Sequence, residues 1–225
     1  MLDGVKIDVR RRKRKTVSIY IERDGSVSVH VPEALADAEI DDLLKKREYQ
    51  IHTYLAKREL LNINRTEREA VNDQPYLYLG RNYHLQYSEE VKGLTLKGGR
   101  FLLPPGGRER IFDHFKEYYR ARGKVFILPR AQAFAEKMGL TLDEVAILDL
   151  KNRWASCSMK MAKVNFHWKA MMAPVSVIDY LIVHELAHLK YQKHDKPFWN
   201  EVDKVLPGYQ DQVDWLKQYG AALSL

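Results

Sequence analysis

Cysteine is nearly absent from this chain of 225 residues, which contains only Cys157. A single cysteine cannot form an intrachain disulfide, so the class of disulfide-stabilised secreted domains is excluded. The chain also has no run of eighteen apolar residues, so no segment has the length and composition of a transmembrane helix. The first five residues lack the apolar core of a signal peptide. Together these absences predict a cytoplasmic protein that does not associate with membranes.

Positive charge is in excess, and much of it lies in one block. The formal net charge is +7, and residues 10–15 are six consecutive arginines and lysines. Such a block can bind phosphate groups or nucleic acid. It can also be a hairpin turn or the solvated end of a strand. The second interpretation is favoured, because charges of both signs are mixed elsewhere and the sequence places no aromatic stacking platform next to the block.

Apolar residues in the first half of the chain follow mainly the period of β-strands. They alternate with polar residues over 17–21 and 27–31, and Asp24-Gly25 between these segments is a strong turn signal, so a β-hairpin is expected. Two further hairpins are expected within residues 76–103. From residue 37 to about residue 62 the apolar positions recur at helical spacing, which predicts one long helix.

The Pro-Pro-Gly-Gly segment at 104–107 is the best internal boundary, and it predicts two regions, 1–106 and 107–225. The second region is expected to begin with a helix marked by apolar residues over 111–119. A second helix or a kinked extension, with Pro129 near its start, should follow over 125–138 and end at Gly139. Strands at 145–150 and 163–168, flanking a turn at 153–158, and a closing helix over 210–222 should follow. The fold class is therefore α+β: a β-rich first half with one long helix, then a helical half with a small sheet.

The most informative stretch is His184-Glu185-Leu186-Ala187-His188, followed by His194. Residues i and i+4 share one face of a helix, so His184 and His188 can point at the same metal ion. Glu185 lies about 100° further around the helix, where it can reach a water molecule at the metal rather than the metal itself. Three nitrogen ligands leave one position of a tetrahedral zinc ion open, as a catalytic site requires. The pattern predicts one Zn²⁺ per chain.

The surrounding sequence supports a helix at this position. Ser176 and Asp179 have the spacing of a capping box before a run of apolar residues at helical intervals. Asp195 has the position of an N-cap for a helix from 196 to about 206. His194 is therefore expected in the turn between two helices, free to fold back onto the metal. Two alternatives remain open: the histidines can be core residues without a metal, and Glu201 is a rival third ligand.

Several segments resemble one known family. Residues 152–158, 164–168, 178–180, 184–189 and 194–199 are similar to the YgjP-like predicted metal-dependent hydrolases, which are relatives of the SprT and WLM minimal zincins. Residues 11–19 resemble the opening of that family, so the resemblance spans nearly the whole chain. It implies a zincin-like fold around the metal. Ala155 stands where the family motif R-W-G-S-C-S has glycine, and alanine would be strained there if the backbone needed a positive φ. Metzincins share the histidine spacing, but Tyr191 occupies their glycine position, so that class is not assigned.

The remaining parts of the site are less well specified by the sequence. Arg153 and Tyr191 are candidates for contacting the oxyanion or the substrate, with His167 and Tyr209 as further candidates. Asp179 and Asp195 are weak candidates for orienting the ligand histidines. Cys157 can be an inhibitory thiolate, although a small buried side chain is the simpler interpretation. The strand at 163–168 is expected to be an edge strand beside the metal, able to pair with an extended peptide.

Three functions are compatible with these residues. The leading one is a zinc metallopeptidase in which Glu185 is the general base and the substrate is a peptide or protein. The second is a metal-dependent nucleotide phosphohydrolase that uses the basic block at 10–15. Against it, the chain has no Gly-rich phosphate loop, and histidine ligands suit zinc better than magnesium. The third is a zinc-containing DNA- or protein-binding module, although such a module would have no need of Glu185.

Overall fold

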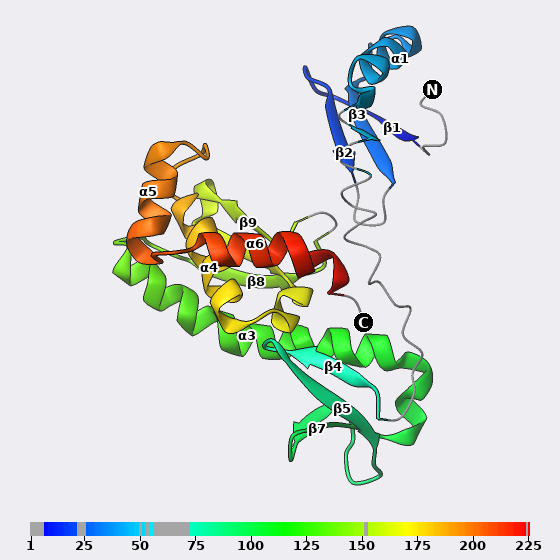
Figure 1. Ribbon diagram of the computed structural model, residues 1–225, viewed down its shortest axis with the longest axis vertical. Coiled ribbons are helices and arrows are strands. Elements are labelled where there is room, and N and C mark those ends of the chain that lie inside the picture. Colours follow the sequence, from blue (N-terminus) through cyan, green and yellow to red (C-terminus); the bar gives the residue numbers. More distant parts are fainter. Residues whose placement is uncertain are drawn as a thin grey trace. The chain divides into compact units, whose positions relative to one another are not determined.

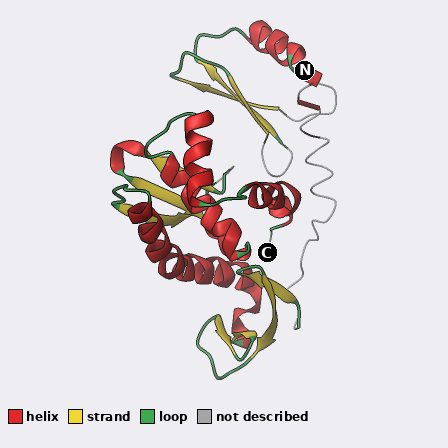
Figure 2. Ribbon diagram, turned by 60° about the vertical axis from the view of Figure 1, so that its left-hand side comes forward, coloured by secondary structure: helices red, strands yellow, loops and turns green. Residues whose placement is uncertain are grey.

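The computed structural model describes residues 7–21, 26–49, 51–52, 55, 73–150, 153–223 and 225. Two compact units make up the chain, Met1–Arg65 and Thr66–Leu225. The expected boundary at 104–107 falls inside the second unit. The described strands form three separate sheets, which Figure 2 distinguishes from the helices. Strands and helices are both present in quantity, which confirms the α+β class. Among the described residues, no helix is both long enough and apolar enough to cross a membrane.

The first unit contains a three-stranded sheet with the order β1-β3-β2 (Figure 1). Its strands are β1 (Ile7–Arg12), β2 (Ser18–Ile21) and β3 (Val27–Pro32). The antiparallel pairing of β2 with β3 confirms the strands of the predicted hairpin, whose turn lies outside the described residues. β1 pairs parallel to β3, which the alternation pattern did not predict.

Helix α1 (Asp37–Lys46) packs against one face of this sheet. The apolar side chains of β3 meet Ile40 and Leu44 of the helix in a buried core. The described residues 48–49, 51–52 and 55 are again helical, so the predicted long helix is interrupted at Arg47, where α1 ends. There the backbone N–H donates to the carbonyls of Leu44 and Lys45, the tightened bonding of a final turn. Residues 56–62 lie outside the described residues.

The second unit begins with a four-stranded sheet of order β4-β5-β7-β6. Its strands are β4 (Pro75–Tyr78), β5 (Arg81–Tyr87), β6 (Thr95–Lys97) and β7 (Arg100–Leu103). The two predicted hairpins are confirmed, and parallel pairing of β5 with β7 joins them. The first hairpin turn requires Gly80, because φ is +78° and an added Cβ would lie 2.9 Å from the Cα of Pro174. This close approach fixes the sheet against Pro174, which precedes the helix that begins at Val175.

A single helix, α3 (Ile111–Lys137), follows the short 3-10 turn Pro105–Arg110 and runs through Pro129 without ending. It packs against both α4 (Val175–Ala187) and β8 (Glu144–Leu148) (Figure 1). Gly123 permits this close packing, since a Cβ there would come within 3.3 Å of Ile147 and Met171. The expected stop at Gly139 is present, with φ at +66°.

The third sheet has the order β8-β10-β9, with β8 (Glu144–Leu148), β9 (Ala155–Ser158) and β10 (Lys163–His167). The prediction of a turn over 153–158 is wrong for 155–158, because these residues pair antiparallel with β10. The prediction that 163–168 is an edge strand is also wrong. β10 lies in the centre of the sheet, parallel to β8, so β9 is an edge strand.

The chain then forms the 3-10 turn Trp168–Met172 and three helices, α4 (Val175–Ala187), α5 (Lys196–Val205) and α6 (Gln210–Tyr219). A last 3-10 turn, Gly220–Ala222, extends the predicted closing helix. The expected N-cap of α5 is confirmed, since the Asp195 side chain accepts a hydrogen bond from the Phe198 N–H at 3.3 Å. These helices bring the conspicuous histidines together.

Candidate metal site

Helix α4 is held in place by an ion pair and not by the predicted capping box. The helix begins at Val175 after Pro174, without a side-chain cap. Asp179 instead accepts two hydrogen bonds from Arg130 of α3, at 2.8 and 2.6 Å. Such a bidentate contact fixes both distance and orientation between two helices. The capping-box interpretation is therefore wrong, because the carboxylate it needs is used in a tertiary contact.

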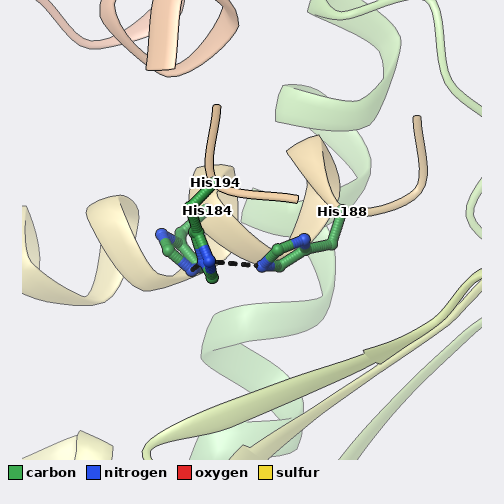
Figure 3. A group of neighbouring side chains, drawn as sticks. All are labelled: His184, His188 and His194. Carbon is green, nitrogen blue, oxygen red and sulfur yellow. Dashed lines mark hydrogen bonds between the residues drawn. The ribbon is translucent and has the colours of Figure 1, made fainter. Parts of the chain in front are cut away.

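Three histidines from two segments converge at the end of α4 (Figure 3). His184 lies in the helix, His188 caps its carboxyl end, and His194 lies in the turn before α5. The Nε2 atom of His194 is 3.0 Å from that of His188 and 3.1 Å from that of His184. The rival ligand Glu201 is not part of this group. Its Oε2 atom instead lies 3.7 Å from Nζ of Lys190.

Hydrogen bonds on the far side of the imidazoles orient two of these rings. Nδ1 of His188 is 3.0 Å from the carbonyl oxygen of Tyr191. A carbonyl can only accept, so this Nδ1 carries the proton and the Nε2 lone pair points into the cluster. Nδ1 of His184 is 3.2 Å from the hydroxyl of Tyr180. The expected orienting residues Asp179 and Asp195 instead bind Arg130 and cap α5.

The environment favours neutral imidazoles. Burial, together with the neighbouring His188 and His194, lowers the pKa of His184 to about 3. Burial and His188 also lower the pKa of His194. Histidine binds a metal through the lone pair of its neutral form. These two rings are therefore in the ligand form at neutral pH.

Glu185 is the buried carboxyl group of this region, with 8% of its surface exposed. Burial raises its pKa to about 7, and the positive charge of Arg153 opposes the rise. A carboxyl group with a pKa near neutrality can both accept and return a proton at physiological pH. Glu185 thus has the properties of an acid–base residue next to the histidine cluster.

A cavity of about 590 Å³ contains the histidines and Glu185. Its other walls come from β9, α4 and α6, and include Ala155, Tyr180, Leu181 and Leu216. Arg153 lines this cavity, as the sequence suggested. The other candidate, Tyr191, does not line it, whereas its neighbour Gln192 does. Sequence reasoning missed Leu216, because nothing in its local spacing relates α6 to the site.

Two residues of β9 resolve questions raised by the sequence. Ala155 is a strand residue and is not among the described non-glycine residues with positive φ, so alanine causes no backbone strain there. Cys157 lines the cavity, and burial and the charge of Glu185 raise the pKa of its thiol to about 11. The thiol therefore stays protonated at neutral pH, which argues against an inhibitory thiolate.

A stack of aromatic rings connects the supports of His184 and His194. Tyr209 lies parallel to Tyr180 at 6.1 Å and to Trp199 at 5.4 Å between ring centroids, with interplanar angles of 6° in both pairs. Trp199 stacks on His194 and donates from Nε1 to its backbone carbonyl at 3.2 Å. Tyr209 is thus linked to His184 and His194 through Tyr180 and Trp199. Sequence reasoning missed this link because the stack joins α4, α5 and the start of α6.

The α+β fold, the three convergent histidines and the buried glutamate are the features expected of a metal-dependent hydrolase. The YgjP-like metallopeptidase domain matches residues 15–219, and the chain therefore belongs to the YgjP-like family. This confirms the resemblance seen in the sequence. No curated protein sequence matches the chain. Among solved structures, the metallopeptidase zymogen abylysin of Pyrococcus abyssi is similar, with 27% identity over 40% of this chain and 91% of that chain and a TM-score of 0.38.

Proposed function

We propose that this protein is a zinc-dependent peptidase in which His184, His188 and His194 hold one Zn²⁺. The observation that carries the proposal is the convergence of three Nε2 atoms at 3.0–3.1 Å, with one lone pair fixed toward the centre. Three Nε2 atoms this close together can all direct their lone pairs at one cation. An all-nitrogen donor set of three fits a catalytic zinc ion and leaves a position for the substrate.

Glu185 is the proposed general base. Zinc, when bound, supplies positive charge that acidifies water and polarises the scissile carbonyl. Glu185 takes the proton from the attacking water and passes it to the nitrogen of the leaving amine. Its raised pKa suits both steps, because a carboxylate of lower pKa would be a weaker base toward water, and a carboxyl group of higher pKa would be a weaker acid toward the amine.

Arg153 is the proposed contact for the oxyanion or the substrate. Its exposed side chain lies at the cavity, and its charge acts on Glu185. A guanidinium can donate hydrogen bonds to the oxygen on which negative charge develops. Tyr191 is the weaker of the two candidates, because its carbonyl supports His188 and its side chain does not line the cavity.

The substrate-binding strand is proposed to be β9. Its residues Ala155 to Cys157 line the cavity, and one of its edges is unpaired in the described sheet. An edge strand offers N–H and C=O groups that an extended peptide can pair with, independently of the peptide sequence. This arrangement favours a peptide over a nucleotide. Of the described residues that line the cavity, only Arg153 is a lysine or arginine, whereas a polyphosphate would favour several.

The decisive experiment compares Glu185→Gln with wild type, measuring bound zinc and the hydrolysis of casein, a peptide pool and nucleoside triphosphates. Turnover of peptide should fall by about 10²–10⁴-fold or more with zinc retained, because only the base is removed. Glu201→Gln is the matched control and should keep its activity. Glu185-dependent release of phosphate without peptide cleavage would move the protein to the phosphohydrolases. Zinc binding without any turnover would favour a binding module.

A further inference from the structure

One face of the first unit's sheet collects basic and aromatic side chains that are scattered in the sequence. Paired residues of neighbouring strands point to the same side of a sheet. The register places Arg10 beside His30, and His30 beside Ser18. Tyr20 lies two residues along β2 and therefore faces the same way. The opposite face carries Val27, Val29 and Val31 against α1, so the basic face is the one that α1 leaves uncovered.

The basic block divides between the two faces of the sheet. Arg11 is structural: its guanidinium donates to the carbonyls of Glu33 and Leu35 and to Asp37, which ties β1 to the start of α1. Arg10 and Arg12 alternate with it and belong to the opposite face. The chain after β1 adds Arg14, whose Nη2 donates to the Ser18 hydroxyl at 2.6 Å.

Positive charge dominates this face. Asp8 is the one carboxylate among its described strand residues, and it pairs with Arg10 at 2.6 Å. Arg12 has no ion-pair partner among the described residues. Three guanidiniums against one carboxylate leave an excess charge that complements a polyanion.

An aromatic pair lies on the same surface. The rings of Tyr20 and His30 are 4.8 Å apart at an angle of 55°, and Tyr20 is 37% exposed. Spacing along the chain does not predict this pair beside the basic block, because the strand register creates it. The exposed ring of Tyr20, next to the half-buried His30 and to arginines, suits an unpaired base, which stacks on the ring while the arginines contact phosphates. An acidic peptide would satisfy the charges but has no planar group for the rings.

We infer that this face, formed by Arg10, Arg12, Arg14, Tyr20 and His30, binds single-stranded nucleic acid. The rings are too few to read a sequence, so the expected binding tolerates different bases and depends strongly on salt. None of these residues belongs to the proposed zinc site, so a test of nucleic-acid binding does not depend on whether the protein is a peptidase.

Fluorescence anisotropy of the full chain with a labelled oligothymidylate of about twelve nucleotides tests this inference. Tyr20→Ala should weaken binding by about tenfold, the effect of losing one stacked base, and Tyr20→Phe should restore it. Arg12→Gln should weaken binding and lower the salt slope by about one. The matched control is Lys46→Gln, which removes one positive charge from α1 of the same unit and should change little.

Three outcomes would overturn the inference. The oligonucleotide can fail to bind. It can bind wild type and Tyr20→Ala equally, with Lys46→Gln as harmful as Arg12→Gln, which would indicate charge attraction without a site. An acidic peptide of matched length and charge can bind more tightly than the oligonucleotide, which would assign the face to an acidic protein.

Discussion

The two units use polar side chains in opposite ways. The second unit encloses them: Glu185 is buried, and burial raises its pKa to about 7, while burial and the neighbouring histidines lower the pKa of His184 to about 3. The first unit carries them on a sheet face, where Arg10 pairs with Asp8 and Arg14 donates to the hydroxyl of Ser18. Enclosed groups gain reactivity because water no longer screens them, whereas displayed groups act through charge and remain sensitive to salt.

The supporting structure differs in the same way. The histidine cluster depends on α4 and α5 and on the ion pair that Arg130 of α3 forms with α4. It also depends on the aromatic stack around Tyr209, the residue before α6. The basic face depends on three short strands and their register. Substitutions in the second unit should therefore have large effects that spread between residues, and those in the first should be local.

The largest expected effect is the loss of a ligand. His188→Ala should abolish stoichiometric zinc binding and peptide hydrolysis, since losing even an outer supporting group lowers metal affinity by about ten- to a hundredfold. Mass spectrometry of metal content after dialysis measures this. His52→Ala, a partly exposed histidine of the first unit, is the control and should keep its zinc. Equal zinc in both variants would contradict the proposed ligand set.

The parts of the site that share one helix were predictable from sequence. His184, Glu185 and His188 follow from helical spacing, and Asp195 follows from its preference for the N-cap position. The alternating strands of the first hairpin were equally clear. In each case the determining residues are neighbours along the chain, so the local pattern and the final structure agree.

The predictions that failed concern residues whose structure depends on partners distant in the sequence. Residues 155–158, Ala-Ser-Cys-Ser, have little intrinsic strand preference and become a strand because β10 pairs with them. Asp179 has the spacing of a capping residue, but Arg130, 49 positions earlier, binds it instead. The Tyr20–His30 pair likewise depends on register. A pattern in one segment cannot specify which partner it will meet.

A smaller effect is expected at Tyr209, which touches no ligand. Tyr209→Leu removes the ring between Tyr180 and Trp199 and should lower zinc affinity by about tenfold, the usual cost of a lost outer support. Tyr209→Phe keeps the stack and should retain near-normal affinity. Competition with a chromogenic chelator gives the dissociation constants.

The control for Tyr209 comes from the first unit. Tyr20→Leu also removes an aromatic ring, but from an exposed sheet face, and should leave zinc affinity unchanged. If Tyr209→Leu binds zinc as tightly as Tyr20→Leu, the aromatic stack has no part in positioning the histidines. A loss in Tyr209→Phe as large as in Tyr209→Leu would assign the effect to the hydroxyl instead.

The smallest predicted effect is a pH dependence of the metal-free protein. The pKa of His184 is about 3 in the folded chain against an ordinary value of 6.5, so the unfolded chain binds the proton first as the pH falls. The contribution of neutral His184 to the free energy of unfolding is therefore fully present above about pH 6.5 and is lost progressively between pH 6.5 and pH 3. Thermal melting after chelation should show a lower midpoint at about pH 5 than at about pH 7.5. His184→Gln removes the titrating group and should flatten this dependence, whereas His52→Gln in the first unit should not. If the melting midpoint depends on pH equally in both variants, burial of His184 is not the cause of the dependence. The two units would then not differ in this effect of burial on stability.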